Sequence, residues 1–487
     1  MSVFSNSVKS AIIDPVFTSS TRCEFRLANR GEAYMPTMRI GNLGLSKTAQ
    51  NDNQYHFGPG AASVINRIQL LDGNEELDSL RNVSNWLTFK NSLHTNSQND
   101  NVFTNMVGGS LGWATGATGE LLSNDNKLVR GLRNGAPGPE TLGTLDLREV
   151  FPILNAVSHL STTLFPNLRV VVEYHSDPRA LVNVQSANGI AGLAKSVPIL
   201  IVDEIVDEAL IQSLDSQFTS AAWVGIEHDQ VQVPQVPNID ATKAVTLSEV
   251  QSVNLRVNGF QDKAVSRIMI SKVYQDLSQY LDTPAEVGGG QSQMRGLAQF
   301  GSRALHKEEF NMRVNGRNVL AGRGVTDPAS ATMLLSDTWG ELNMCPGMNI
   351  ESVGLDSKYT LTAARRQAAT LVPVGRPCSN WVGVGKTSPR ILTAGGILDA
   401  ADPTQWAAAT LPEAQQGYFT GNAAWYGLGV HDRVTDLQIQ YTRTGNASTA
   451  GGQSSSPGNY LALDLHLFGE VAKRIDVSGG SWKISYA

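Results

Sequence analysis

The chain has 487 residues and a mass of 52.3 kDa, with 41% hydrophobic and only 17% charged residues. This composition excludes a disordered chain, and the length predicts two or three domains. A formal net charge of −6 and an isoelectric point of about 5.8 exclude a strongly basic protein that would bind nucleic acid over a broad surface.

The cysteines predict no covalent framework. Cys23, Cys345 and Cys378 lie far apart and form neither a disulfide pattern nor a zinc motif, so we expect three reduced thiols and folding inside a cell. The first residues lack the apolar stretch of a signal peptide, and the longest apolar run, residues 197–202, is far shorter than the ~20 residues of a membrane span. The sequons at Asn82 and Asn446 are therefore expected to carry no glycan.

The N-terminal segment, residues 1–19, is predicted to be an arm outside the domains. In a short helix, Val8 and Ile12 would share one face, and Pro15 would end that helix at about Asp14. An isolated helix of this length is marginal in water, so we expect the arm to become ordered only when it docks on a neighbour.

Beyond the arm, the dominant period is two, which indicates strands with one face on a core and one toward polar surroundings. This alternation occurs in residues 25–27, 67–70, 253–257, 437–441 and 461–467. Asp72-Gly73, Asn258-Gly259 and Asn315-Gly316 follow strand-like runs and predict tight turns. Helical patterns are short, at residues 84–92, 361–369 and 403–409, and the polar stretches 96–139 and 445–459 predict long loops. An all-β chain follows.

Several segments recur in the same order in the two halves of the chain. Residues 168–174 correspond to 437–441, residues 197–206 to 460–468, and the segment around Trp223 to the segment around Trp482, at nearly constant spacing. This pattern predicts two related domains, at residues 20–228 and 245–487. The proline-containing residues 229–244 between them are predicted to be an extended linker.

The titratable residues show no catalytic or metal-binding pattern. None of the eight histidines has the spacing of a metal motif. His175 near Asp177, His228 beside Asp229, His431 beside Asp432, and Asp464 with His466 are interpreted as exposed polar pairs. The acidic residues Asp203, Glu204, Asp207 and Glu208, and the basic residues Arg365, Arg366, Lys386 and Arg390, are interpreted as solvated faces or intersubunit ion pairs.

Three glycine-containing matches to known motifs lack the required context. The G-x-S-x-G match around Ser110 lies in a polar loop without a following helix, the match around Lys386 lacks the first glycine of a phosphate loop, and Gly288–Ser292 precedes no dinucleotide fold. We therefore predict no catalytic, cofactor-binding or metal-binding residues and no cofactor. This profile is more typical of a structural protein than of an enzyme.

Some segments resemble a known family. Asp146-Leu-Arg-Glu-Val-Phe-Pro152, then Leu164-Phe-Pro166 running into a strand that ends at Tyr174, and the aromatic helix Asn85-Trp-Leu-Thr-Phe89 are similar to parts of the double jelly-roll major capsid proteins of icosahedral DNA viruses. That lineage includes the adenovirus hexon and the coats of virophages, polinton-like viruses and large DNA viruses. The resemblance spans most of the chain at the level of pattern.

The resemblance implies two tandem eight-stranded jelly-roll β-sandwiches with long loops and short helices. It further implies a homotrimer that forms a pseudo-hexagonal capsomer and tiles an icosahedral shell. The partners would be other copies of the chain, penton and minor or cement capsid proteins and, in some members, an internal membrane, without specific recognition of nucleic acid. The protein would be made and assembled in the host cell and located in the virion.

Two alternatives remain open at this point. A carbohydrate-binding or carbohydrate-active β-sandwich, such as an adhesin, would have exposed aromatic residues on one sheet face or paired carboxylates in a groove. A minor or penton capsid component would have a single terminal jelly roll and a fibre domain. The duplicated layout favours the major coat protein.

Overall fold

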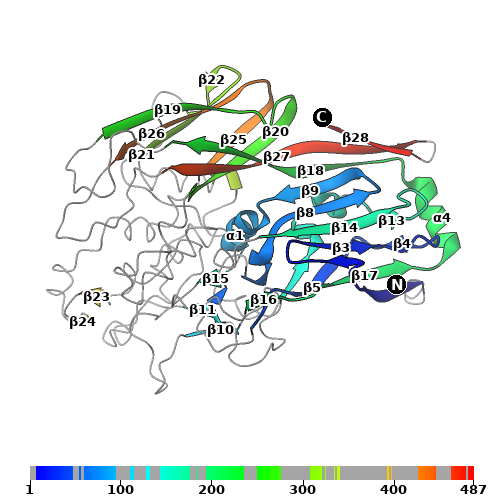
Figure 1. Ribbon diagram of the computed structural model, residues 1–487. Coiled ribbons are helices and arrows are strands. Elements are labelled where there is room, and N and C mark those ends of the chain that lie inside the picture. Colours follow the sequence, from blue (N-terminus) through cyan, green and yellow to red (C-terminus); the bar gives the residue numbers. More distant parts are fainter. Residues whose placement is uncertain are drawn as a thin grey trace, which may run out of the picture.

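The protein is described by a computed structural model. The described residues are 7–47, 54–55, 60–94, 110–113, 128–131, 143–175, 182–183, 193–234, 249–275, 308–320, 324, 334, 337–339, 392–393, 396–397, 426–445, 462–478 and 481–486. Strands dominate among them (Figure 1). No helix in these ranges is both long and apolar enough to cross a lipid bilayer.

The first sandwich consists of two antiparallel sheets. One contains β1 (Val8–Ile13), β17 (Ile199–Ile205), β5 (Arg39–Leu43), β12 (Gly143–Asp146), β4 (Ala33–Tyr34) and β13 (Leu160–Ser161). The other contains β2 (Phe17–Thr18), β3 (Arg22–Arg26), β14 (Leu168–Tyr174), β8 (Ile65–Asp72) and β9 (Glu75–Arg81).

The second sandwich has the same construction. Its first sheet contains β18 (Ser220–Val233), β27 (Leu463–Ser478), β20 (Lys263–Tyr274), β25 (Tyr426–Val434) and β28 (Ser481–Tyr486). Its second sheet contains β19 (Glu249–Val257), β26 (Leu437–Gly445), β21 (Glu308–Val314) and β22 (Arg317–Asn318).

Smaller elements lie between these strands. The short strands are β6 (Leu45–Lys47), β7 (Gln54–Tyr55), β10 (Ser110–Trp113), β11 (Leu128–Gly131), β15 (Val182–Asn183), β16 (Leu193–Lys195), β23 (Leu392–Thr393) and β24 (Gly396–Ile397). The helices are α1 (Val83–His94) and α4 (Glu208–Gln217), with 3₁₀ turns η1 (Gly60–Val64), η3 (Leu147–Glu149) and η4 (Pro152–Asn155). The predicted helix at 84–92 is thus confirmed as α1, whereas the candidates at 361–369 and 403–409 lie outside the described residues.

Both sandwiches have jelly-roll topology. In the first, the eight principal strands in chain order are β1, β3, β5, β8, β9, β12, β14 and β17, and they form sheets in the orders β1-β17-β5-β12 and β3-β14-β8-β9. In the second, the orders β18-β27-β20-β25 and β19-β26-β21-β22 follow the same ranks. Two jelly-roll sandwiches in an all-β chain were predicted from the sequence and its resemblance, and both are confirmed. β14 matches β26 in rank and β17 matches β27, as the first two recurring segments predicted.

The N-terminal segment differs from its prediction. Residues 8–13 form the strand β1, not a helix, and pair antiparallel with β17 from Val8 opposite Ile205 to Ile13 opposite Leu200. The spacing of Val8 and Ile12 suits a helix, but the β-branched residues also suit a strand. Pairing with β17 supplies the backbone hydrogen bonds that an isolated helix would have to form alone. Part of the predicted arm therefore belongs to the first sandwich.

The third predicted correspondence, between the segments around Trp223 and Trp482, was wrong. Trp223 lies in β18, the first strand of the second sandwich, whereas Trp482 lies in the added strand β28. β18 pairs with β27 along its whole length, from Ser220 opposite Asp476 to Val233 opposite Leu463. Residues 220–228, assigned above to the first domain, thus lie in the sheet of the second sandwich, and residues 229–233 of the predicted linker continue the same strand.

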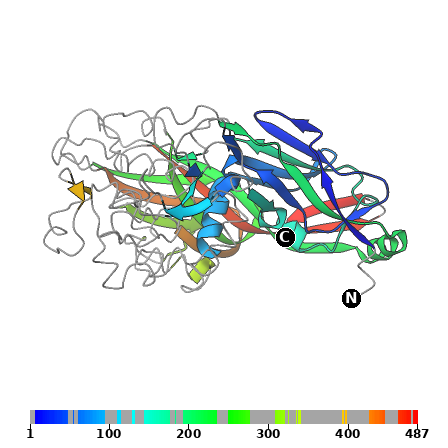
Figure 2. The same ribbon diagram turned by 90° about the horizontal axis from the view of Figure 1, so that it is seen from below.

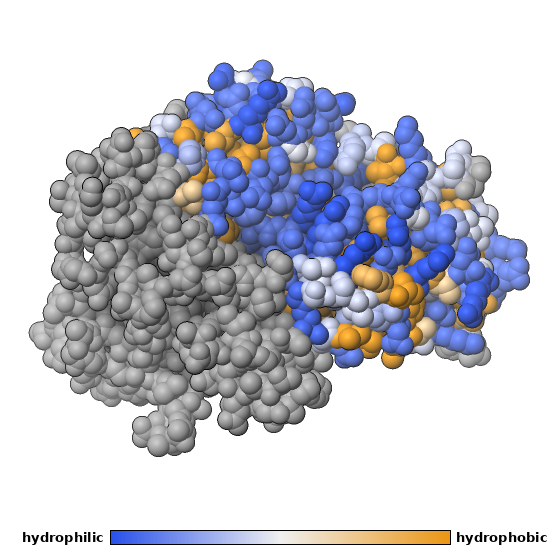
Figure 3. Space-filling model, in the orientation of Figure 1, coloured by the Kyte–Doolittle hydropathy of each residue, from blue (hydrophilic) through white to orange (hydrophobic). Residues whose placement is uncertain are grey.

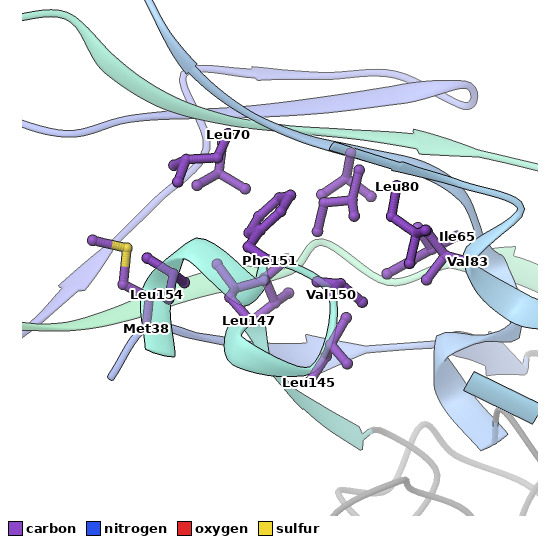
Figure 4. Close-up of a cluster of buried hydrophobic side chains, with 14 of the residues drawn as sticks. Met38, Ile65, Leu70, Leu80, Val83, Leu145, Leu147, Val150, Phe151 and Leu154 are labelled. Carbon is purple, nitrogen blue, oxygen red and sulfur yellow. The ribbon is translucent and has the colours of Figure 1, made fainter. Parts of the chain in front are cut away.

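The first core is filled by loop residues as well as strands. Between β12 and β13 the chain makes η3 and η4, which place Leu147, Phe151 and Leu154 between the two sheets (Figure 4). Phe151 is fully buried and points toward Leu70 and Leu80 of the opposite sheet (Figure 4). The Pro-bearing segment that contributed to the family resemblance is therefore a plug of the sandwich core.

The turn at Asn315-Gly316 was predicted correctly. Asn315 and Gly316 have φ angles of +50° and +81°, and they connect β21 to β22. Two successive positive φ angles are typical of the tight hairpin turns that asparagine and glycine favour. The Asn315 side chain also accepts a hydrogen bond from the backbone N–H of Thr435 at 2.7 Å, which fixes the turn against the β25–β26 connection.

Candidate functional site

The candidate site is the junction where the two sandwiches meet. The N-terminal half of β18 and the C-terminal half of β27, together with β28, run across the first sandwich beside β9 and β8 (Figures 1 and 2). Trp223, Ile226 and Ile475 of these strands are buried in the first core. The long strands therefore hold the two sandwiches together within one chain.

Aromatic side chains form the centre of the junction. Trp86 of α1 lies 5.9 Å from Phe89 and 5.7 Å from Phe468 of β27, measured between ring centroids. Trp339 packs edge-on against Phe89 at 5.2 Å and lies 6.0 Å from Trp86. Contacts of this geometry stabilise an interface by about 0.5–1.5 kcal/mol each beyond the buried area. The aromatic helix that the sequence singled out thus joins the sandwiches.

A buried charge cluster crosses the same junction. Lys473 of β27 lies 2.6 Å from Glu227 of β18 and 3.7 Å from Asp78 of β9, and Asp78 is fully buried. Burial raises the pKa of Asp78 to about 6, against the opposing attraction of Lys473. Burial alone would also raise the pKa of Glu227, but Lys473 and Lys263 hold it below its ordinary value. Asp78 belongs to the first sandwich and the other groups to the second, so the cluster couples the two.

A polar cleft of about 610 Å³ is lined by residues of both sandwiches. Its walls include three histidines, from the end of β14 (His175), from β18 (His228) and from β27 (His466). His228 Nε2 lies 3.2 Å from His466 Nδ1, and their rings stack at 5.4 Å. Burial lowers the pKa of His175 to about 4, of His228 to about 3 and of His466 to about 4. All three are therefore neutral near pH 7.

Polar groups in and beside the cleft make hydrogen bonds that hold the structure together. The Ser84 hydroxyl, 3.3 Å from His175 Nε2, is fully buried and donates to the carbonyl of Ile65 at 2.8 Å, so it is placed as a structural group and not as a nucleophile. Asp229 accepts from the Gly259 N–H at 2.7 Å, and Asp464 accepts from Gln275 at 2.8 Å. Within the described ranges, no group of three or more histidine, cysteine or acidic side chains is arranged to hold a metal ion.

Several of the histidine and acidic residues that were interpreted from the sequence as exposed pairs line the cleft instead. Asp464 and His466 do share a face, but both line the cleft, as do His175, His228 and Asp229, so the interpretation as exposed strand residues was wrong for the buried histidines. The sequence could not bring them together, because they come from three strands of two sandwiches.

The remaining candidates have ordinary roles or lie outside the description. Asp203 accepts from Ser10 and Thr37, and Asp207 caps α4 by accepting from the Leu210 N–H. Ser110 begins the strand β10 instead of lying in a loop. Cys23 is a buried free thiol, and burial raises its pKa to about 11. Outside the described residues lie Cys345, Cys378, Arg365, Arg366, Lys386, Arg390 and residues 288–292.

Comparison with solved structures identifies the same overall fold. PBCV-1 VP54, fitted into a reconstruction of the virophage Sputnik, is similar with a TM-score of 0.50 and 12% identity, over 99% of this chain and 97% of that chain. A PBCV-1 capsid structure matches with a TM-score of 0.50 and 11% identity over the same shares. The Faustovirus major capsid protein has a TM-score of 0.47, with 9% identity over 97% and 90% of the two chains. Neither a protein-family profile nor a curated protein sequence matches.

Proposed function

We propose that the chain is a major capsid protein that assembles as a homotrimer into a pseudo-hexagonal capsomer of an icosahedral virion. The observation that carries this proposal is the tandem of two sandwiches with one strand order, joined through a buried junction in a single chain. Three such chains supply six similar sandwiches, which suits a position with six neighbours. The fold shared with the PBCV-1 capsid over nearly the whole length supports the same role.

The junction suits a structural role. Its aromatic contacts and its buried ion pairs join β18 and β27 to the first sandwich, so the two sandwiches behave as one block. A rigid block with fixed angles between its parts is what a regular shell requires. The proposed partners are further copies of the chain, penton and minor capsid proteins, and an underlying cement layer or membrane, and the proposed location is the virion. We propose no enzymatic activity.

The division into domains is proposed on the same basis. Residues 8–205 contain the eight strands of the first jelly roll, and residues 220–486 contain those of the second. Helix α4 connects them. This moves the division from the predicted residues 229–244 toward the N-terminus.

The mass of the purified protein in solution tests the proposal. We expect a particle of three times 52.3 kDa that persists on dilution to micromolar concentration, measured by sedimentation equilibrium. Electron microscopy of the same sample should show a hexagonal outline. A stable monomer at these concentrations would contradict the trimer, and binding to a glycan array would favour the carbohydrate-binding alternative.

A further inference from the structure

The cleft between the sandwiches contains polar atoms for which the described part of the chain supplies no partner. Asn85 of α1 lines the cleft and is 2% exposed, yet its Oδ1 atom accepts no hydrogen bond there. Arg67 of β8 pairs through its terminal nitrogens with Glu76 at 3.4 Å and Glu173 at 4.0 Å, whereas its buried Nε atom donates no hydrogen bond. Buried polar atoms without partners are rare and destabilising, so these two indicate a partner from outside the chain.

The stacked histidines offer one more donor and one more acceptor to the cleft. Both rings are neutral near pH 7, because burial lowers their pKa values, and His228 Nε2 lies 3.2 Å from His466 Nδ1. One ring therefore donates to the other, and whichever ring donates, the two remaining nitrogens are one N–H donor and one unprotonated acceptor. Neither remaining nitrogen has a hydrogen bond to another described residue. The pair can thus bind a donor and an acceptor of a ligand in either tautomer.

The cleft has little net charge. Two arginines and three carboxylates line it: Arg67, Arg81, Glu173, Asp229 and Asp464. An anion would meet the carboxylates, and a cation would meet the guanidinium groups, so the walls favour a neutral ligand. Arg81 is exposed at the end of β9 and has neither an ion pair nor a side-chain hydrogen bond in the described part of the chain, so its donors are available to such a ligand.

The walls of the cleft suit hydroxyl groups better than a peptide. A hydroxyl both donates and accepts, so a ring with several hydroxyls can pair with the acceptor on Asn85 and with the donor on Arg67. A peptide also carries both kinds of group, but its recognition uses pockets for alternate side chains, and Val273 is the only apolar residue among the described walls. Hydrophilic residues gather where the two sandwiches meet in the space-filling view (Figure 3). The volume of about 610 Å³ is typical of small-molecule sites.

We propose that the cleft binds a neutral pyranose sugar. Its hydroxyls donate to Asn85 Oδ1 and accept from Arg67 and Arg81, and the histidine pair supplies a further donor and acceptor. The walls come from both sandwiches, so the site requires both of them. Such a site adds a binding activity to the capsid role if the protein is a trimer, whereas sugar binding by a monomer favours the carbohydrate-binding alternative.

Saturation-transfer difference NMR on the full-length protein tests the site. The probes are the methyl glycosides of glucose, galactose, mannose and N-acetylglucosamine. Methyl phosphate is the counter-probe, because an anion would also use the two arginines. We expect a saturable signal from at least one glycoside, with a dissociation constant on the order of 1 mM, and no signal from methyl phosphate.

Two variants and a control locate the signal. Arg81→Ala removes an exposed donor, and Gln230→Trp places a large ring at an exposed position of β18 that lines the cleft, so neither substitution removes a core contact. Arg39→Ala is the matched control, since Arg39 is exposed on β5, in the other sheet of the first sandwich. We expect both cleft variants to raise the dissociation constant at least about tenfold and the control to leave it unchanged.

The outcomes separate the site from the trimer. A glycoside signal that both cleft variants weaken and the control retains supports the site. The site is overturned by the absence of any glycoside signal, by a signal from methyl phosphate alone, or by a glycoside signal that the cleft variants leave unchanged. Sedimentation of the same samples reports the trimer independently. If circular dichroism shows that Gln230→Trp does not fold, Arg81→Ala decides alone.

Discussion

Replacing Lys473 by methionine should destabilise the junction in a way that depends on pH. The substitution keeps an unbranched side chain that is one atom shorter, but it removes the charge that lies 3.7 Å from the buried Asp78 and 2.6 Å from Glu227. In the wild-type protein the pKa of Asp78 is already raised to about 6 from its usual 3.8, which corresponds to about 3 kcal/mol of destabilisation at neutral pH. Without Lys473 this pKa must rise further.

The magnitude follows from proton uptake. A buried carboxyl that loses its cation binds a proton, so its added cost cannot exceed about 1.4 kcal/mol for each pH unit above the original pKa. For Asp78 this limit is near zero at pH 6, about 1.4 kcal/mol at pH 7 and about 2.8 kcal/mol at pH 8. Glu227 also loses its nearer lysine, but Lys263 at 3.6 Å remains. Its share should therefore change little over this range.

Urea unfolding at pH 6, 7 and 8, followed by tryptophan fluorescence, measures the difference. Protein concentration must be held fixed, because association contributes to stability. Lys263→Met is the control, since Lys263 pairs with Glu227 but has no ion pair with Asp78 in the described part of the chain. The loss of stability in Lys473→Met should grow with pH, while that in the control stays level. Equal losses at all three pH values would refute the coupling between Lys473 and Asp78.

Two further predictions concern the cleft and the N-terminal strand. The pKa values of His175, His228 and His466 in the folded protein lie below the unfolded value of 6.5. The unfolded chain therefore takes up protons first, so the protein is destabilised as pH falls from 6.5 toward 4, and this loss is absent above pH 6.5. Asp78 has a raised pKa, so its contribution to stability increases as pH falls from 6 to 3.8 and opposes the effect of the histidines. In a thermal-shift series, His466→Gln should lose less stability at acid pH than the wild type. An unchanged pH profile would contradict the conclusion that His466 is buried in its neutral form. Deleting residues 1–13 should lower the melting temperature by about 1–2 °C for each ~1 kcal/mol lost, because β1 covers one edge of β17. Deleting only residues 1–6 is the control. A folded 1–13 deletion that is as stable as the full chain would contradict the role of β1.

Local sequence signals predicted local structure well. The Asn315-Gly316 dipeptide requires a turn with positive φ angles at both residues and has one. The strict alternation of residues 461–467 predicted a strand with one buried face, and Leu463, Leu465 and Leu467 are buried. Each signal depends only on neighbours in the chain, so sequence alone contains the relevant physics.

The features that the sequence did not predict, the strand β1 and the histidine cleft, depend on contacts between residues far apart in the chain. Val8 and Ile12 fit either a helix or a strand, and the choice depends on β17, almost two hundred residues later in the chain. The cleft brings His228 beside His466, which are 238 residues apart. No spacing rule relates such positions, because their proximity follows from the pairing of β18 with β27 and from the packing of one sandwich on another.

The two strands of equal rank differ in a way that suggests how the block is used. β27 alternates, with His466 and Phe468 on its outer side, and that side is covered by the first sandwich of the same chain. On the outer side of β17, Ile199 and Ile201 are partly exposed, whereas Ile205 is buried with Ile211 of α4. The outer side of β27 therefore serves within the chain as a contact that joins the two sandwiches, whereas Ile199 and Ile201 of β17 lie at the surface of the single chain.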